Sequence, residues 1–268
     1  MLKKFKNISS KLYLILIFIF LYAPIAVLIV FSFNDSKSMA TWNGFTLKWY
    51  YQLFNNTRIL RALYYTIGIA VASSIIATII GTISAIGIHK SKGFKKKILL
   101  NINYIPVLNP DIVTGISLMC LFIVFRSIFD VQFGLVTMLL AHITFNIPYV
   151  ILSVLPKLKQ LPQNLEEAAL DLGASPSYAL RKVILPQIKP GIISGFLIAF
   201  TMSVDDFVIS FFTTGSGVTN LSIEIYSMAK RGIKPEINAL STLMFAVVLI
   251  LLLFMNRKDT IIGGEAIE

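Results

Sequence analysis

Long apolar runs separated by short polar segments dominate this chain of 268 residues. Four runs contain no Lys, Arg, Asp or Glu over 20 residues or more, and two others of that length carry acidic residues. A helix of about 20 apolar residues crosses the hydrocarbon core of a bilayer. The pattern therefore predicts an all-α membrane protein with one domain over residues 1–268 and six transmembrane helices, at about residues 12–34, 62–88, 98–125, 131–156, 190–213 and 237–256.

The composition agrees with a membrane protein and excludes an ordinary soluble domain. Hydrophobic residues make up 56% of the chain and charged residues 14%, and the mean hydropathy is +0.78. Six buried helices of a large soluble protein are not a good alternative, because the connecting segments could not form a polar shell around them. The first apolar run is too long for a cleaved signal peptide and no small-x-small site follows it, so we expect it to be retained.

The positions of Lys and Arg predict the orientation. With the N-terminus inside, 16 of the 24 basic residues fall in cytoplasmic segments, and the cluster at residues 90–97 is the clearest single indication. Both termini are then cytoplasmic. The net charge of +11 reflects this topology, and binding of nucleic acid is not favoured because no basic face is interleaved with exposed aromatics. Cys120 is the only cysteine, so no intramolecular disulfide can form.

The largest cytoplasmic segment is an insert at about residues 157–189, and its sequence predicts two short helices. Asn164 is a suitable N-cap, and Glu167 stands three residues later as a capping-box partner. Gly173 fits the position just after a helix end. A second helix should begin at the pair Ser175-Pro176 and end at Leu185-Pro186. Ala168, Ala169 and Leu172 would share one face of the first helix, with Glu166 and Asp171 pointing elsewhere.

The spacing within this insert resembles the EAA signature of ABC importer permeases. It reads Glu-Ala-Ala at residues 167–169, three residues, Gly173, nine residues, and then Val-x-Leu-Pro at residues 183–186, with Val where Ile is usual. The resemblance implies the type I importer fold and a coupling helix that sits in a groove on an ATPase, through Glu167, Ala168, Ala169, Asp171, Leu172 and Gly173. Two alternatives are a solvated amphipathic loop and a DNA-binding helix-turn-helix. The second is disfavoured because its second helix would lead directly into a membrane span.

The chain carries no chemistry for ATP hydrolysis of its own. It contains no G-x-x-x-x-G-K-[ST] motif, so ATP and Mg²⁺ should be used by a separate ATPase subunit. His89 and His142 are isolated, and no Cys/His set suggests a metal site. We therefore expect no catalytic residue, no cofactor and no metal in this chain.

Three acidic residues lie inside predicted spans: Asp111, Asp205 and Asp206. Ionisable residues there are costly and usually functional. Both acidic positions lie roughly 20 Å from the cytoplasmic end at about 1.5 Å per residue, so the carboxylates should share a depth, somewhat outward of the midplane. Pro106 and Pro110 should break the first helix and free carbonyls, and carbonyls together with acids attract cations. The alternative is a structural role, or a place in the outer interface where an acid costs less.

Adjacent residues on a helix point about 100° apart, so Asp205 and Asp206 cannot both face one path squarely, and one could cap or brace the other. An aromatic segment at residues 45–54 is read as an interfacial helix at the outer surface, with an aromatic cage for ammonium groups as the alternative. Small residues of the second span and a G-x-x-x-G at Gly191 and Gly195 favour close helix packing.

Several segments resemble the polyamine branch of these permeases more closely, among them residues 109–113 (Asn-Pro-Asp-Ile-Val), 203–208 (Ser-Val-Asp-Asp-Phe-Val) and 235–240 (Pro-Glu-Ile-Asn-Ala-Leu). The resemblance implies import of spermidine or putrescine through the bacterial inner membrane. It also implies a second permease, two ATPase subunits and an external substrate-binding protein as partners. One alternative is a permease for another cationic or small organic solute. A gradient-driven cation transporter or channel is disfavoured, because no internal inverted repeat accompanies the six spans.

Overall fold

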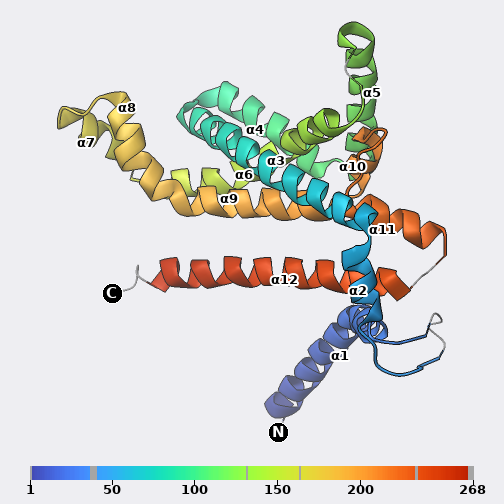
Figure 1. Ribbon diagram of the computed structural model, residues 1–268. Helices are drawn as coiled ribbons and strands as arrows, with labels where there is room; N and C mark the ends of the chain where they lie inside the picture. The colour runs from blue at the N-terminus through green and yellow to red at the C-terminus, as the bar shows by residue number, and fades with distance from the viewer. Residues whose placement is uncertain (1, 37–40, 131, 163, 233–234, 265–268) are drawn as a thin grey trace. The chain divides into compact units, whose positions relative to one another are not determined.

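The computed structural model describes residues 2–36, 41–130, 132–162, 164–232 and 235–264, with side chains described from residue 11 to residue 250. The regular elements in these ranges are helices, apart from an isolated antiparallel bridge between Asn34 and Phe45 (Figure 1). The prediction of an all-α protein is therefore confirmed.

The helices belong to two compact units, one made of Met1–Leu60 and Glu224–Ile250 and the other of Arg61–Ile223 and Leu251–Glu268. The first unit holds most of α1 (Leu2–Phe31), α2 (Lys48–Asn55), α11 (Leu221–Lys230) and α12 (Pro235–Gly264). The second holds most of α3 (Thr57–Lys90), then α4 (Gly93–Leu108), α5 (Asp111–Phe129), α6 (Leu135–Gln160), α7 (Leu165–Asp171), α8 (Pro176–Tyr178), a π-helix (Ala179–Ile184), α9 (Leu185–Asp205) and α10 (Val208–Thr213).

Within the first unit, the aromatic segment forms a helix, as predicted, and packs onto its own chain. The indole Nε1 of Trp49 in α2 donates a hydrogen bond to the carbonyl of Asn34 at 2.7 Å, and the Trp49 side chain is buried. Phe33 stacks on Phe45 with ring centroids 5.3 Å apart. Nζ of Lys48 lies 5.2 Å from the centroid of the Trp49 ring. The interfacial position of this segment and the alternative, an aromatic cage for ammonium groups, both stay predictions. In the same unit, Arg58 pairs with the buried carboxylate of Glu224 at 2.8 Å.

Helix α6 is the centre of the second unit. Its residues Val150, Ile151, Val154 and Leu155 are buried together with small or branched residues of α3 and α9. A Cβ atom added at Gly81 of α3 would lie 2.7 Å from Cβ of Val150, and one added at Gly195 of α9 would lie 3.3 Å from its Cα. Glycine at these positions lets the backbones approach closely. The predicted close packing is thus realised inside this chain, between α6 and its two neighbours.

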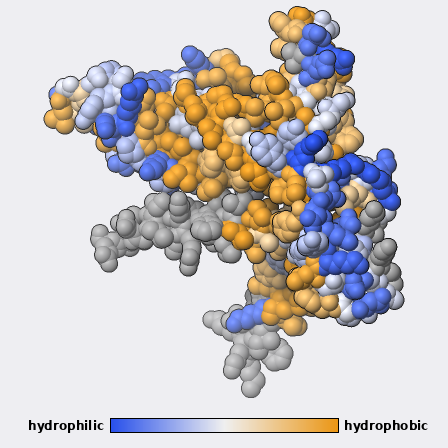
Figure 2. Space-filling view, viewed as in Figure 1, coloured by the Kyte–Doolittle hydropathy of each residue, from blue (hydrophilic) through white to orange (hydrophobic). Residues whose placement is uncertain are grey.

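Among the described residues, five helices are long and apolar enough to cross a membrane: Lys11–Phe31, Thr57–Lys90, Asp111–Phe129, Leu135–Gln160 and Pro176–Asp205. The described apolar part of α12, Pro235–Ile250, is shorter, so a sixth span stays a prediction. Many apolar side chains on these helices are exposed, such as Phe20 at 80%, and Figure 2 shows hydrophobic residues over the surfaces of α3 and α9. Such surfaces need lipid or another protein to cover them.

The predicted span at residues 98–125 is broken into two helices, as its prolines indicated. Helix α4 ends at Leu108, Asn109 and Pro110 are extended with ψ of 137° each, and α5 begins at Asp111. A residue before proline is driven out of the α region, so Asn109 ends the helix. Pro106, expected to contribute to the break, lies inside α4.

The predicted span at residues 190–213 also differs in the structure. Helix α9 already begins at Leu185 and ends at Asp205, Asp206 is extended, and α10 begins at Val208. The sequence pattern did not predict this break because no proline or glycine marks it.

We predict that Gly81→Ala destabilises the protein by about 1–3 kcal/mol, because the added methyl group would overpack against Val150. Gly87→Ala in the same helix has nothing within 4 Å of its new Cβ. That variant should be neutral or stabilising by up to about 1 kcal/mol through helix propensity. Thermal unfolding of the purified variants in detergent measures both effects, and equal midpoints would contradict the close packing of α3 on α6.

Candidate coupling insert and candidate translocation site

The candidate coupling helix α7 ends in the manner the sequence predicts. Gly173 has φ of +84°, its N–H donates to the carbonyl of Leu170 at 2.9 Å, and the N–H of Ala174 donates to the carbonyl of Ala169 at 3.1 Å. These two bonds form a Schellman motif, which satisfies the last carbonyls of the helix. Glycine adopts the left-handed conformation without a steric penalty, so Gly173 both stops α7 and redirects the chain.

The predicted capping box at the start of α7 is wrong. Asn164 makes no side-chain capping bond, and its φ of −94° and ψ of 5° differ from the extended backbone that an N-cap requires. The first turn is closed by the backbone, because the N–H of Leu165 donates to the carbonyl of Pro162 at 3.1 Å. The start of α8 agrees with the prediction, since Oγ of Ser175 accepts from the N–H of Tyr178 at 3.3 Å.

The predicted end of the second short helix at Leu185-Pro186 is also wrong, because a π-helix carries the chain from α8 into α9 without a break. The N–H of Leu185 donates to the carbonyl of Leu180, five residues earlier. A proline ring clashes with the carbonyl four residues before it in an α-helix. The wider π turn directly before Pro186 relieves this clash, so the insert is continuous with a candidate span.

The coupling insert presents its small and apolar residues to the outside. None of the α7 residues is buried, and Leu172 is 89% exposed, the highest value among the described large hydrophobic residues. Ala169, Leu172, Gly173, Ser175 and Tyr178 line an open hollow of about 590 Å³ between α7 and α8. This surface can receive side chains of another protein.

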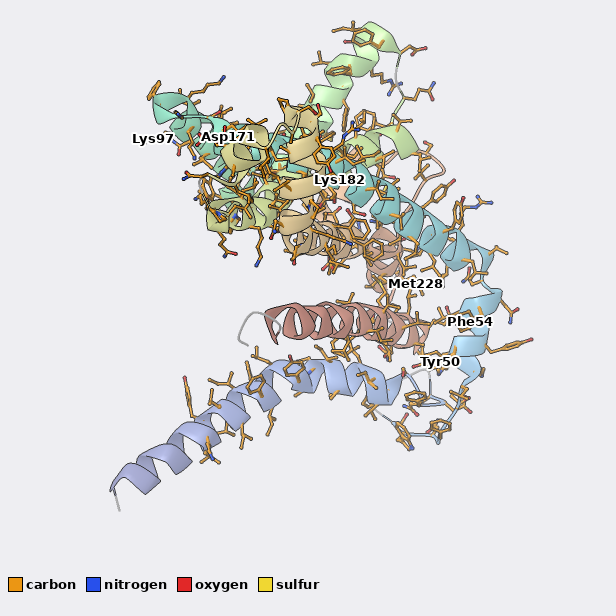
Figure 3. All side chains as sticks on the ribbon, turned by 90° about the vertical axis from the view of Figure 1, so that its left-hand side faces the viewer. Tyr50, Phe54, Lys97, Asp171, Lys182 and Met228 are labelled. Atoms are coloured by element: carbon orange, nitrogen blue, oxygen red, sulfur yellow. The ribbon has the colours of Figure 1, made fainter. Side chains whose placement is uncertain are left out.

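Among the described residues, one ion pair attaches the insert to the rest of the second unit. Glu166 of α7 pairs with Nζ of Lys90, the last residue of α3, while Glu167, Ala168 and Asp171 remain exposed. Figure 3 labels Asp171 and Lys182, which come from α7 and the π-helix. The insert is thus joined to α3 by this pair and to α9 by the π-helix that follows α8.

The three predicted pathway acids lie at helix breaks and close to one another. Asp111 is the first residue of α5, Asp205 is the last residue of α9, and Asp206 follows it. The carboxylates of Asp111 and Asp206 are both near enough to that of Asp205 for their charges to act on it. The predicted common depth of these acids stays a prediction, and the helices from which it was calculated are interrupted at Asn109-Pro110 and at Asp206.

Asp206 has a structural role. Its carboxylate accepts hydrogen bonds from the N–H of Ile209 at 3.2 Å and of Ser210 at 2.7 Å, so it caps α10. The ring nitrogen Nε2 of His142 lies 3.6 Å from Oδ2 of Asp206 and is hydrogen-bonded to Oγ of Ser210 at 2.9 Å. Nδ2 of Asn220 donates to the Asp206 carbonyl at 2.8 Å. The predicted 100° separation of two helical neighbours does not apply, because the chain leaves the helix between them.

Asp111 and Asp205 are held differently from Asp206. Both residues are exposed, and neither forms an ion pair within the described part of the chain. These two carboxylates are therefore available to a cation, whereas that of Asp206 is engaged.

A buried polar network beside the acids was missed by the sequence analysis. Nδ2 of Asn146 donates to Oγ of Ser203 at 2.7 Å, and Ser203 is hydrogen-bonded to Ser73 at 3.1 Å. This network joins α6, α9 and α3 in the region that also holds His142. The signal in the sequence is the i, i+4 spacing of His142 and Asn146 within an apolar span, which places both on one face of the helix.

Among the described side chains, no group of three or more His, Cys, Asp or Glu residues is placed to hold a metal ion.

The fold agrees with comparisons to known proteins. Residues 77–257 match the family described as the binding-protein-dependent transport system inner membrane component. A chain from a bacterial ABC transporter for alginate, solved in complex with a pentasaccharide-bound periplasmic protein, superimposes with a TM-score of 0.77 at 18% identity. The match covers 97% of this chain and 96% of that one. At this identity, the likeness establishes the fold alone.

The chain belongs to the binding-protein-dependent inner membrane components, the permease subunits of ABC importers. It is a multi-pass membrane component of a transporter and not its catalytic subunit. It is 40% identical over 237 residues to the spermidine/putrescine transport system permease protein PotC of Escherichia coli K12, covering 88% of each chain. It is also 39% identical over 243 residues to the putrescine transport system permease protein PotI of the same strain, covering 88% of this chain and 85% of PotI.

Proposed function

We propose that this chain is a permease subunit that carries polyamines, such as spermidine or putrescine, into the cytoplasm, and that α7 couples it to a separate ATPase. The observation that carries the substrate assignment is the similarity to PotC and PotI over most of the chain. The acid cluster supports it independently, because polyamines are chains of ammonium groups joined by short apolar linkers.

The chemistry of the break between α9 and α10 suits such a cation. The carboxylate of Asp205 is exposed at the C-terminal end of α9, where unpaired carbonyls add partial negative charge. Asp111 lies close by at the break before α5. Asp206 keeps the break in shape by capping α10. We propose that Asp111 and Asp205 attract the ammonium groups and that Asp206 positions the segment that holds Asp205.

A permease for another cationic or small organic solute is the second candidate. The same carboxylates would attract any compact cation, and an external binding protein would determine most of the substrate selectivity. A gradient-driven transporter is not favoured, because the chain belongs to a family of ABC importer components.

The proposed assembly contains a second permease, two ATPase subunits that use ATP and Mg²⁺, and an external substrate-binding protein. Two features of the chain support further subunits. The coupling insert exposes Leu172 beside an open hollow, and apolar residues of α1 such as Phe18 and Phe20 are exposed. Each surface would be covered by a partner or by lipid in the assembled transporter.

Both termini and the insert are proposed to lie on the cytoplasmic side, because most Lys and Arg residues fall in the segments that this orientation places inside. In intact cells carrying Cys120→Ser, a cysteine introduced at Ser177 should react with a membrane-permeant maleimide and be protected from an impermeant one. A cysteine at Thr46, predicted to lie outside, should react with both reagents. Reversed labelling would contradict the orientation and the coupling role of α7.

We predict that Asp205→Asn and Asp111→Asn each lower spermidine uptake about tenfold, which corresponds to about 1.4 kcal/mol. Asp206→Asn should have a smaller effect, because its remaining side-chain oxygen can still cap α10. Spermidine uptake should fall more than putrescine uptake, since spermidine carries more charge. Uptake of radiolabelled polyamine at matched expression, in cells that hold the complete transporter, measures all three variants.

Asp130→Asn is the matched control for these variants. Asp130 is an exposed acid with φ of 52° at the C-terminal end of α5, a conformation that asparagine tolerates. Spermidine uptake by the Asp130→Asn variant should be unchanged. Normal transport by Asp111→Asn and Asp205→Asn would show that these carboxylates do not serve the translocation path.

For the coupling helix, we predict that Gly173→Val leaves the protein in the membrane but lowers ATP-driven uptake about tenfold, equivalent to about 1.4 kcal/mol. A side chain at φ of +84° costs about 1–2 kcal/mol, so the turn after α7 would change its course. Glu167→Lys, which reverses the charge of an exposed α7 residue, should weaken attachment of the ATPase. Co-purification of the ATPase and ATP hydrolysis in reconstituted vesicles measure the two effects.

Gly217→Val is the control for backbone strain. Gly217 has φ of +85° and open space around its position, but it lies in the loop between α10 and α11. The strain is therefore matched to that at Gly173, and ATPase attachment should stay normal. If Gly173→Val and Gly217→Val lost attachment of the ATPase equally, general instability of the protein would explain the loss.

A further inference from the structure

A pocket of about 380 Å³ lies in the second unit, where α3, α4, α6 and α7 end or begin. Lys90, Lys96 and Lys159 line it together with His89, and most of the remaining lining is apolar. The proposed translocation role does not use this pocket, and the proposed coupling role uses only its Lys90–Glu166 pair. Its combination of clustered ammonium groups and apolar walls indicates an amphiphilic ligand.

The positive charge in this pocket is only partly compensated. Glu166 is its one acidic lining residue, and it already pairs with Lys90. Lys96 donates a 3.3 Å hydrogen bond to the neutral carbonyl of His89. Within the described part of the chain, Lys96 and Lys159 form no ion pair. Two ammonium groups thus face one pocket without a matching anion, an arrangement that an anionic ligand would stabilise.

His89 supplies a second, independent observation. Its ring nitrogen Nδ1 is buried and has no hydrogen-bond partner. A buried polar atom without a partner costs about 1–3 kcal/mol, so a ligand that bonded this atom would be stabilised. His89, Lys96 and Lys159 line the same pocket, so one ligand could contact all three side chains. A neutral imidazole that donates from Nδ1 would complete a set of donors for an anion.

We propose that this pocket binds a phosphate group and that an anionic phospholipid of the cytoplasmic leaflet supplies it. Lys96, Lys159 and His89 would hold the phosphate, while Lys90 stays paired with Glu166. A lipid is favoured over a soluble phosphate compound for two reasons. The pocket lies at the ends of the candidate spans α3 and α6, and apolar residues such as Ile86 and Leu158 line it beside the lysines. Basic pockets between membrane helices are suited to anionic headgroups.

The proposal can be tested by native mass spectrometry of the full-length chain in detergent, titrated with phosphatidylglycerol or phosphatidylcholine. Wild type should prefer phosphatidylglycerol. The double variant Lys96→Gln/Lys159→Gln should lose about thirtyfold of that preference. This factor assumes that each of the two lysines contributes the free energy that is typical of a basic residue near an anionic membrane surface. Its control is Lys92→Gln/Lys95→Gln, which removes the same charge at the same end of α4, from residues that do not line the pocket. The control should retain the preference.

Equal losses in the two double variants would overturn the proposal, because the attraction would then come from surface charge in general. Absence of any lipid preference in wild type would overturn it as well. Thermal unfolding with millimolar inorganic phosphate separates the two sources of the anion. Stabilisation by phosphate that requires Lys96 and Lys159, without a preference for phosphatidylglycerol, would assign the pocket to a soluble ligand and overturn the lipid assignment.

Circular dichroism checks that the variants are folded. Lys159→Gln alone is the milder second variant, and it should lose about sixfold of the preference for phosphatidylglycerol.

Discussion

The close approach of α6 to α3 and α9 is the interaction on which the second unit depends. In a bilayer, lipid covers apolar side chains as well as protein does, so helices associate through tight packing and interhelical hydrogen bonds. Gly81 and Gly195 remove the side chains that would hold the neighbouring helices away from Val150. Ser73, Asn146 and Ser203 then join the same three helices by hydrogen bonds. The candidate coupling insert and the candidate translocation site both adjoin these three helices.

The acid cluster shows how helix breaks can create a polar site within apolar segments. Backbone groups released at a break must find partners or water, because lipid supplies none. At the second break, Asp206 satisfies two amide groups of α10, and its own carbonyl accepts from Asn220. This arrangement separates the roles of two neighbouring acids. Asp206 is used to maintain the break, and Asp205 is left exposed at the end of α9.

The coupling insert shows a related division between fixed and exposed groups. Glu166 is held by Lys90 at the end of α3, and the Schellman bonds after α7 fix the turn at Gly173. Leu172 and Ala168 remain on the outside. The π-helix before Pro186 makes α8 and α9 one continuous body, so force applied to the insert can reach the helix that ends at Asp205. This continuity is consistent with the proposed coupling, and the phosphate pocket lies where α7 meets the end of α3.

The sequence by itself determined the class of fold, the apolar character of the membrane segments and the turn at Gly173, because these depend on local composition and on backbone preferences. It also singled out Asp111, Asp205 and Asp206, whose place in the translocation path stays a prediction. It did not determine the break at Asp206, which no proline or glycine marks and which is stabilised by contacts with His142 and Asn220 from distant segments. The π-helix directly before Pro186 has a local cause that the sequence analysis did not recognise, the clash of that proline, and the first turn of α7 is closed by the Leu165 N–H instead of the Asn164 side chain. Tertiary structure alone decided which acid is engaged and which is free, because hydrogen-bond partners far apart in the sequence make that choice.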